Sequence, residues 1–341
     1  MAWPDRSGSG WVVAMAEIAE LDGDQAALRE FFEVEQAAHA ADRSYAVLRT
    51  WPQLQHMRRQ TSPYFRRTFL VARDRGRMVG TADLGLSLQD NLHLAEVEVR
   101  VLPDARRRGI GRALHDEVLR RGRAEGRTTY LGEACRPYDA EGSPATSFAR
   151  ALGYDAARRE DHQVLDLPHD AGPPPASSAG YDVLAWTNTA PAELLDEYAT
   201  MRTQMLRDMP SGDVDWEPVV IDPDRIREEE TRNGVAYDHI VAVARRTTDG
   251  ELAGYSKVFL PHGQELVVQD DTMVMGSHRG RGLGLLLKGA VLRVLSAEHP
   301  ERRVVHTWNA VDNAPMQRIN AALGFRPVEL ALEMQLKVTD G

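Results

Sequence analysis

Two short glycine-rich turns contain the residues whose types and spacing most clearly indicate chemistry. Each follows the pattern Arg-x-x-Gly-x-Gly, as RRRGIG in the first half of the chain and RGRGLG in the second. Glycine lets the backbone approach a ligand closely, free N–H groups at a helix start attract anions, and arginine donates to phosphate oxygens. The pattern predicts a pyrophosphate-bearing cofactor. The candidate ligands are Arg106, Arg107, Arg108, Gly109, Ile110, Gly111, Arg279, Gly280, Arg281, Gly282, Leu283 and Gly284.

Two rival interpretations of these turns compete with cofactor binding. A tight, soluble turn would account for one isolated copy, but less well for two copies in the same context. A dinucleotide-binding loop is the chemical rival, yet neither GIGRAL nor GRGLGL fits G-x-G-x-x-G. Because the chain has a formal net charge of −10, two cationic clusters at equivalent positions, extended by Arg112 and Lys288, favour a phosphate ligand.

The two turns belong to an internal repeat. When Gly109 is aligned with Gly282, Glu98 falls on Asp271, and the tripeptides LGY and LGF follow at nearly equal spacing. The segment HDAGPPPASSAG between the copies is typical of an extended spacer, because three successive prolines cannot continue a helix. We therefore predict an N-terminal unit over residues 1–168, a linker over 169–180 and a C-terminal unit over 181–341.

Hydrophobic periodicity indicates the elements that position the turns. Residues 24–41 and 191–206 have the apolar spacing of helices. The segments TFLVARD and IVAVARR are typical of strands that are followed by a turn and a second strand, and EVEVRVL alternates like a half-buried strand. Each half therefore runs helix, several strands, glycine-rich turn, helix, strand, helix, strand. The predicted fold class is α/β, in two units.

The composition argues against several functional classes. The net charge of −10 disfavours general nucleic-acid binding, which needs a cationic face. No apolar run approaches the length of a membrane span, and the N-terminus lacks the features of a secretion signal. The single cysteine, Cys135, fits a reducing compartment and leaves no Cys/His zinc cluster. We predict a cytoplasmic protein, monomeric or homodimeric, with no metal and no nucleic-acid or membrane partner.

These motifs resemble the GNAT acetyltransferase superfamily. Its signature is a strand, the Arg-x-x-Gly-x-Gly turn and a long helix, followed by a strand, a helix and Leu-Gly-Phe or Leu-Gly-Tyr. The resemblance covers both halves. The architecture that it implies is similar to that of tandem-domain members of the mycothiol synthase type. It implies two tandem GNAT-like domains, each a mixed, mostly antiparallel sheet flanked by helices, with acetyl-CoA as the cofactor.

The resemblance also implies where acetyl-CoA binds. In the family, the strand before the turn separates from its neighbour and pairs its backbone with the pantetheine arm. The matching positions are Thr272, Met273 and Val274 in the second half, and Val99, Arg100 and Val101 in the first. An asparagine near the next strand often contacts the arm, and Asn313 is our candidate, although helix capping would also account for it and Asn309. Since the first half lacks this pair, we expect the second half to be the better-preserved site.

The resemblance has one departure, which concerns the general acid. Many family members place a tyrosine four residues before the glycine of Leu-Gly-Phe, where it protonates the leaving thiolate. This sequence has Asn320 at that position in the second half and Ala149 in the first. Another residue or solvent must therefore supply the proton, or catalysis is slow or lost.

Acidic residues on the strand before each turn are the catalytic candidates. A carboxylate can accept a proton from an alkyl ammonium, and Asp271, aligned with Glu98, is our preferred general base or amine anchor. Strand alternation predicts that Asp270 and Asp271 point to opposite faces. A solvated strand carboxylate is the competing interpretation of Asp271, and His278 and His306 are alternative bases.

Together these features predict an N-acyltransferase that moves an acetyl group from acetyl-CoA to a primary amine of a small molecule. Two alternatives remain, namely acylation of a peptide or protein amine, and a catalytically decayed acyl-CoA-binding protein. The charged segment 207–230 corresponds to a region that often covers the acceptor pocket in the family. It would recruit a cationic amine there, unless it is only a solvated loop and helix start.

Overall fold

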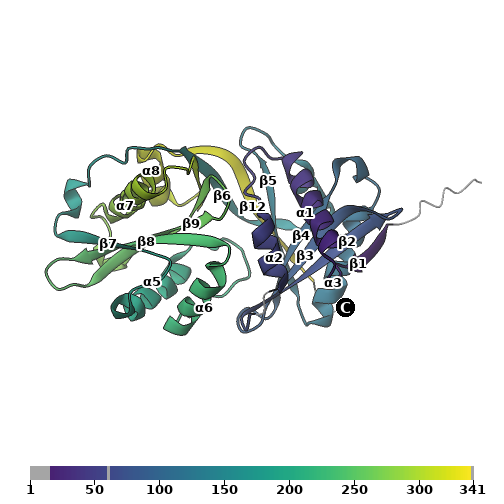
Figure 1. Ribbon diagram of the computed structural model, residues 1–341, viewed down its shortest axis with the longest axis horizontal. Coiled ribbons are helices and arrows are strands. Elements are labelled where there is room, and N and C mark those ends of the chain that lie inside the picture. The colour runs from purple at the N-terminus through teal and green to yellow at the C-terminus, as the bar shows by residue number, and fades with distance from the viewer. Residues whose placement is uncertain (1–15, 60–61, 339–341) are drawn as a thin grey trace, which may run out of the picture.

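The computed structural model describes residues 16–59 and 62–338 (Figure 1). The prediction that no secretion signal is present rests mostly on residues 1–15, which lie outside the described residues. The outer ends of the two predicted units, 1–15 and 339–341, lie outside them as well. The strands are β1 (Glu17–Glu20), β2 (Phe65–Asp74), β3 (Arg77–Ser87), β4 (Leu94–Val101), β5 (Thr129–Pro137), β6 (Asp155–Asp166), β7 (Tyr181–Thr187), β8 (Tyr237–Arg246), β9 (Leu252–Pro261), β10 (Leu266–Val274), β11 (Val304–Ala310) and β12 (Arg326–Lys337). The α-helices are α1 (Gln25–Ala40), α2 (Trp51–Arg59), α3 (Ile110–Ala124), α4 (Pro144–Ala151), α5 (Leu195–Asp208), α6 (Pro223–Asn233), α7 (Leu283–Glu298) and α8 (Ala314–Ala322).

The described strands form one continuous sheet in the order β1-β2-β3-β4-β5-β12-β6-β11-β10-β9-β8-β7. Pairing is antiparallel except between β4 and β5 and between β10 and β11. The last strand of each half crosses to the other, because β12 pairs with β5 and β6 pairs with β11. Figure 1 shows β12 reaching from the second half to the first. Each half of the sheet is thus completed by a strand from the other half.

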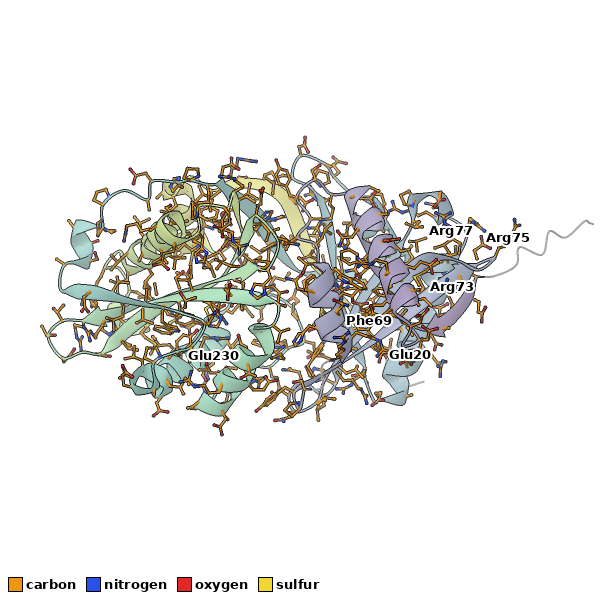
Figure 2. All side chains as sticks on the ribbon, in the orientation of Figure 1. Glu20, Phe69, Arg73, Arg75, Arg77 and Glu230 are labelled. Carbon is orange, nitrogen blue, oxygen red and sulfur yellow. The ribbon has the colours of Figure 1, made fainter. Side chains whose placement is uncertain are left out.

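Helices cover both faces of the sheet in the first half. Asp24 caps α1 by accepting from the backbone N–H of Ala26, as the helix-like spacing from residue 24 predicts. Phe31 of α1 packs edge-on against Phe69 of β2 at 5.4 Å between ring centroids, and Figure 2 labels Phe69 within this half. On the other face Leu114 of α3 lies against Gly80. The first-half core therefore forms on both sides of β2 and β3.

The second half repeats this layering. Tyr198 of α5 packs edge-on against Tyr255 of β9 at 5.2 Å between centroids. On the opposite face α7 buries Leu287 and Leu295 in a cluster that also contains Val305 of β11. The apolar surface on both faces explains why β8 and β9 are almost continuously buried rather than alternating.

Connections also reach from one half to the other. Residues 209–222 join α5 to α6, and Asp215 in this segment accepts a hydrogen bond from Thr129 at 3.2 Å. Arg225 of α6 forms an ion pair with Asp90 of the first half at 2.7 Å. The charged segment 207–230 is therefore partly a contact between halves and partly the start of α6, and it is not simply a solvated loop.

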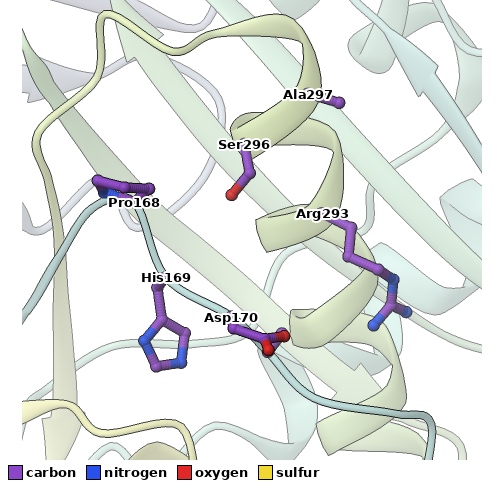
Figure 3. Close-up of a pocket in the computed structure, with 7 residues that line it drawn as sticks. Pro168, His169, Asp170, Arg293, Ser296 and Ala297 are labelled. Carbon is purple, nitrogen blue, oxygen red and sulfur yellow. The ribbon is translucent and has the colours of Figure 1, made fainter.

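The predicted linker lies along α7. A Cβ atom built on Gly282 would be 2.6 Å from Ser177 Oγ, which shows how closely the linker approaches the second glycine-rich turn. Further along, Pro168, His169, Asp170 and Ala171 line a pocket of about 580 Å³ with Arg293, Ser296 and Ala297 of α7 (Figure 3). The α/β fold class predicted from the sequence is confirmed. The boundaries at 168 and 181 stay a prediction, because β6 and β12 cross between the halves of the sheet.

Candidate active site

In both halves, the strand before the glycine-rich turn pairs with its parallel neighbour over only three residues, and the two strands then separate. β4 pairs with β5 only from Leu94 to Glu96, and β10 pairs with β11 only from Leu266 to Val268. Among the described residues, backbone groups beyond these points have no strand partner on that side. An extended ligand with amide groups can pair with such an edge. The predicted pantetheine positions all lie there: Val99, Arg100, Val101, Thr272, Met273 and Val274.

The glycine-rich turns have the geometry of an anion-binding helix start. Gly109 and Gly282 immediately precede α3 and α7, with φ of 83° and 74°, a region in which glycine carries little steric cost. The first helical hydrogen bonds are donated by Ala113 and Leu286 to these glycines. The N–H groups of the three preceding residues in each helix therefore have no intrahelical acceptor. A phosphate can use them.

The basic side chains around the turns differ in what they can contact. Arg106 and Arg279 each donate from Nε to the last carbonyl group of the preceding strand, at 2.9 and 3.0 Å, and each also pairs with an aspartate. Arg108 pairs with Asp74 at 2.6 Å. Lys288 was expected to extend the second cationic cluster, but its side chain is buried between α7 and α8. That expectation was wrong, because Lys288 faces the interior.

A β-bulge interrupts β10 at the two candidate aspartates. Gln269 pairs with Val258 and Thr272 with Ser256, so two residues on β10 oppose one on β9. Asp270 lies 3.8 Å from Lys257, and Asp271 accepts a hydrogen bond from Tyr255 at 2.8 Å. Since Tyr255 and Lys257 are two apart on β9, both aspartates lie on the face covered by α5 and α6. The expectation of opposite faces was wrong, because the bulge breaks the alternation.

Charged groups from α5 and α6 surround these aspartates. Glu229 of α6 binds Lys257 at 2.5 Å and Arg202 of α5 at 3.2 Å. Burial would raise the pKa of Glu229, but Lys257 and Arg202 hold it well below its usual range. Burial raises the pKa of Asp270 to about 7, and the neighbouring Asp271 charge acts in the same direction. About a third of the Asp270 side chain (35%) still reaches solvent, so this carboxyl group combines access with a pKa suited to proton exchange at neutral pH.

The sequence did not identify several members of this cluster. Lys257, Arg202 and Tyr255 carry no motif, and they approach Asp270 and Asp271 only through the fold. Glu229 was visible only as one acid within the charged segment 207–230.

The first half has a different charge arrangement at the equivalent place. Glu98 contacts Arg100 directly and lies 3.7 Å from both Arg49 and Arg67. The cluster contains four carboxylates and three guanidinium groups: Glu35, Asp83, Glu96, Glu98, Arg49, Arg67 and Arg100. Each of these carboxylates contacts at least one guanidinium group.

The asparagines of the second half are engaged with the protein. The side-chain oxygen of Asn313 caps α8 by accepting from Met316 at 3.3 Å, so the capping interpretation holds and the pantetheine contact stays a prediction. Asn320 is buried and accepts a hydrogen bond from Lys288 at 2.7 Å. Burial lowers the pKa of Lys288 to about 7. His278, one alternative base, is buried and bonded through Nδ1 to the Tyr181 hydroxyl at 2.8 Å.

Comparisons with known proteins agree with this geometry. Residues 25–154 match the model of the Acetyltransferase (GNAT) family. A tandem GNAT protein from the clavulanic acid biosynthesis pathway, solved without acetyl-CoA, is 28% identical, with a TM-score of 0.80 over 96% of this chain and 99% of that one. A GCN5-related N-acetyltransferase from Sphaerobacter thermophilus is 16% identical, with a TM-score of 0.68 over 95% and 96% of the two chains. The search of curated proteins found no match.

Neither a membrane span nor a metal cluster is found among the described residues. In the part of the chain that the structure describes, no helix is both long and apolar enough to cross a membrane. Within residues 16–59 and 62–338, no group of three or more His, Cys, Asp or Glu side chains is arranged to hold a metal ion. The family match, the tandem neighbour over nearly the whole chain and the two repeated strand–turn–helix units agree. These findings support the assignment of the chain to the tandem-domain GNAT superfamily and an N-acetyltransferase activity.

Proposed function

We propose that the second half binds acetyl-CoA and transfers its acetyl group to a primary amine of a small molecule. The observation that carries this proposal is the bulge in β10, which brings Asp270 and Asp271 to one face beside the separated strands. The first half has regular pairing throughout β3 and β4. Bulges are frequent next to active sites, because they redirect side chains that a regular strand would turn away.

The residues of the second half fit acetyl-CoA. The free N–H groups at the start of α7 suit its pyrophosphate, and the unpaired edge of β10 suits the amide groups of its pantetheine arm. A Cβ atom on Gly284 would lie 2.6 Å from Ile319 of α8. Glycine at this position therefore lets α7 and α8 approach each other beside the turn. When bound, acetyl-CoA supplies the activated acetyl group.

The charge balance supports an amine as the acceptor. Three carboxylates in the second-half cluster, Glu229, Asp270 and Asp271, face two cations, Arg202 and Lys257. One carboxylate is therefore in excess, and an alkyl ammonium group would balance it. We assign Asp271 and Asp270 the role of holding this group. Glu98, the predicted counterpart of Asp271, contacts Arg100 directly.

The test is thiol release from acetyl-CoA by the intact chain, measured against putrescine, glucosamine, lysine methyl ester and a lysine-containing peptide. Turnover with a small amine, together with acetyl-CoA binding by calorimetry, supports the proposal. Turnover with the peptide alone would favour a peptide or protein amine as acceptor. Tight acetyl-CoA binding without turnover on any amine would favour a decayed acyl-CoA-binding protein.

A further inference from the structure

A buried chain of polar side chains joins the two halves at the centre of the sheet. Arg43, which follows α1, donates to Glu329 of β12 at 2.8 Å. Glu329 lies 3.1 Å from Nδ1 of His162 on β6, and Nε2 of His162 lies 2.9 Å from Nδ1 of His306 on β11. Both histidines are at most 4% exposed. The chain depends on the strand exchange, because β6 and β12 are the two strands that cross.

The proton positions in this chain follow from its chemistry. Burial alone would raise the pKa of Glu329, but its hydrogen bonds with His162 and Arg43 lower the pKa to about 2. Glu329 is therefore a carboxylate, which can only accept hydrogen bonds. A neutral His162 donates to it from Nδ1 and accepts at Nε2 from Nδ1–H of His306. The unprotonated ring nitrogen of His306 is then Nε2.

His306 occupies a defined place beside the candidate site. It is the last residue of β11 in register with β10, where it pairs with Val268. Its neighbour Val305 packs into the cluster beneath α7, so His306 faces the opposite side, which is the face that carries Asp270 and Asp271. Within the described residues, Nε2 of His306 forms no hydrogen bond, and it is not among the atoms sealed from solvent.

The ring of His306 is neutral. Its neighbours hold in place the chain of hydrogen bonds from Glu329 through His162 to His306, which we call the relay. Burial lowers the pKa of His306 to about 4, while the Glu329 carboxylate acts in the opposite direction. The charged or titratable groups around it are His162 from β6, Glu329 from β12 and Arg43. Trp308 stacks on His162 at 4.3 Å between centroids with planes 12° apart, which fixes the orientation of the His162 ring.

The first half has no equivalent of this group. Leu131 is the last residue of β5 in register with β4, which is the position that His306 occupies in β11. A leucine side chain cannot accept a proton. This difference between the halves coincides with the β10 bulge, and both features lie in the second half.

We infer that His306 accepts the proton of the substrate ammonium, with His162 and Glu329 as positioning residues. This inference rests on the proposed function. Nε2 of His306 takes one proton, and the freed nitrogen lone pair forms a bond to the carbonyl carbon of the acetyl thioester. The C–S bond breaks, and the departing thiolate takes up the second proton lost by the nitrogen. Asp270 and Asp271 hold the ammonium before the transfer.

The test compares two amine acceptors that differ in their need for a base. Putrescine is protonated at neutral pH, whereas hydroxylamine is largely unprotonated and needs no proton acceptor before attack. With putrescine, His306→Gln should lower kcat by about 10²–10⁴-fold. With hydroxylamine, the enzyme-dependent rate should change little. Glu329→Gln should give a smaller loss with the same dependence on the acceptor. The matched control, His299→Gln at the end of α7, should leave both rates unchanged.

Two further measurements keep the outcomes distinct. The acetyl-CoA Kd from calorimetry should be unchanged in His306→Gln. Nitrogen-15 spectra of the wild-type histidines should show His162 and His306 protonated at Nδ1. An unchanged putrescine rate in His306→Gln, or protonation of wild-type His306 at Nε2, would overturn the assignment. If the wild type acetylates neither amine although it binds acetyl-CoA, the proposed function fails instead, and the assignment fails with it.

Discussion

Replacing Asp270 with asparagine should stabilise the protein at neutral and alkaline pH while lowering its activity. The pKa of Asp270 is raised from the ordinary 3.8 to about 7, so between these values the folded state keeps a proton that the unfolded state has released. Stability therefore falls as the pH rises through this range. The difference in pKa sets an upper bound of about 4 kcal/mol on the free energy of unfolding that the variant gains above about pH 7. Because about a third of the side chain is in solvent, screening reduces the expected gain to about 1–2 kcal/mol.

Urea unfolding of wild type and Asp270→Asn at about pH 4 and about pH 8 measures this effect. The variant should be more stable at the higher pH, and the difference should shrink at the lower pH, where the wild-type carboxyl group is protonated in the folded state and partly protonated in the unfolded state. Asp312→Asn, in an exposed turn, is the matched control and should show no such gain. A variant that is less stable at about pH 8, or a difference that is the same at both pH values, would refute the reasoning.

Three further outcomes follow from the same geometry. Asp271→Asn should lower kcat/KM for the amine by about 10–100-fold through loss of a charged hydrogen bond and leave the acetyl-CoA Kd unchanged; near-native kinetics would leave Asp271 an ordinary strand residue. Gly282→Trp should abolish acetyl-CoA binding in calorimetry and abolish turnover, whereas Gly109→Trp should leave turnover intact. The reverse result would mean that the first half, and not the second, is catalytic. Leu332→Ala on β12 should destabilise the first-half core by about 2–5 kcal/mol in urea unfolding; a neutral effect would argue against the strand exchange.

The sequence predicted the elements well, because each has a local signal. The helical spacing that starts at Asp24 appears as α1, and both glycine-rich turns start helices, as expected. The exchange of β6 and β12 could not be predicted in this way. Alternation identifies a strand and its buried face but not its neighbour, and two homologous halves offer each strand two similar partners.

The candidate site was less predictable for the same physical reason. The bulge at Asp270 and Asp271 adds one residue to β10, so it reverses the predicted face of one side chain. Lys288 is buried because it finds Asn320 on another helix. The relay through His306 needs residues from four separate segments. None of these contacts has a pattern within a single stretch of sequence.

The most direct measurement of the central claim is the rate at which the chain forms an acetylated small amine from acetyl-CoA. Mass spectrometry of the amine and thiol release should give matching rates for the wild type. The rate should fall strongly when Asp270 and Asp271 are both replaced by asparagine, and it should be unchanged in Asp312→Asn. Equal rates in the double variant and the wild type would contradict the placement of amine acetylation at the second-half carboxylates.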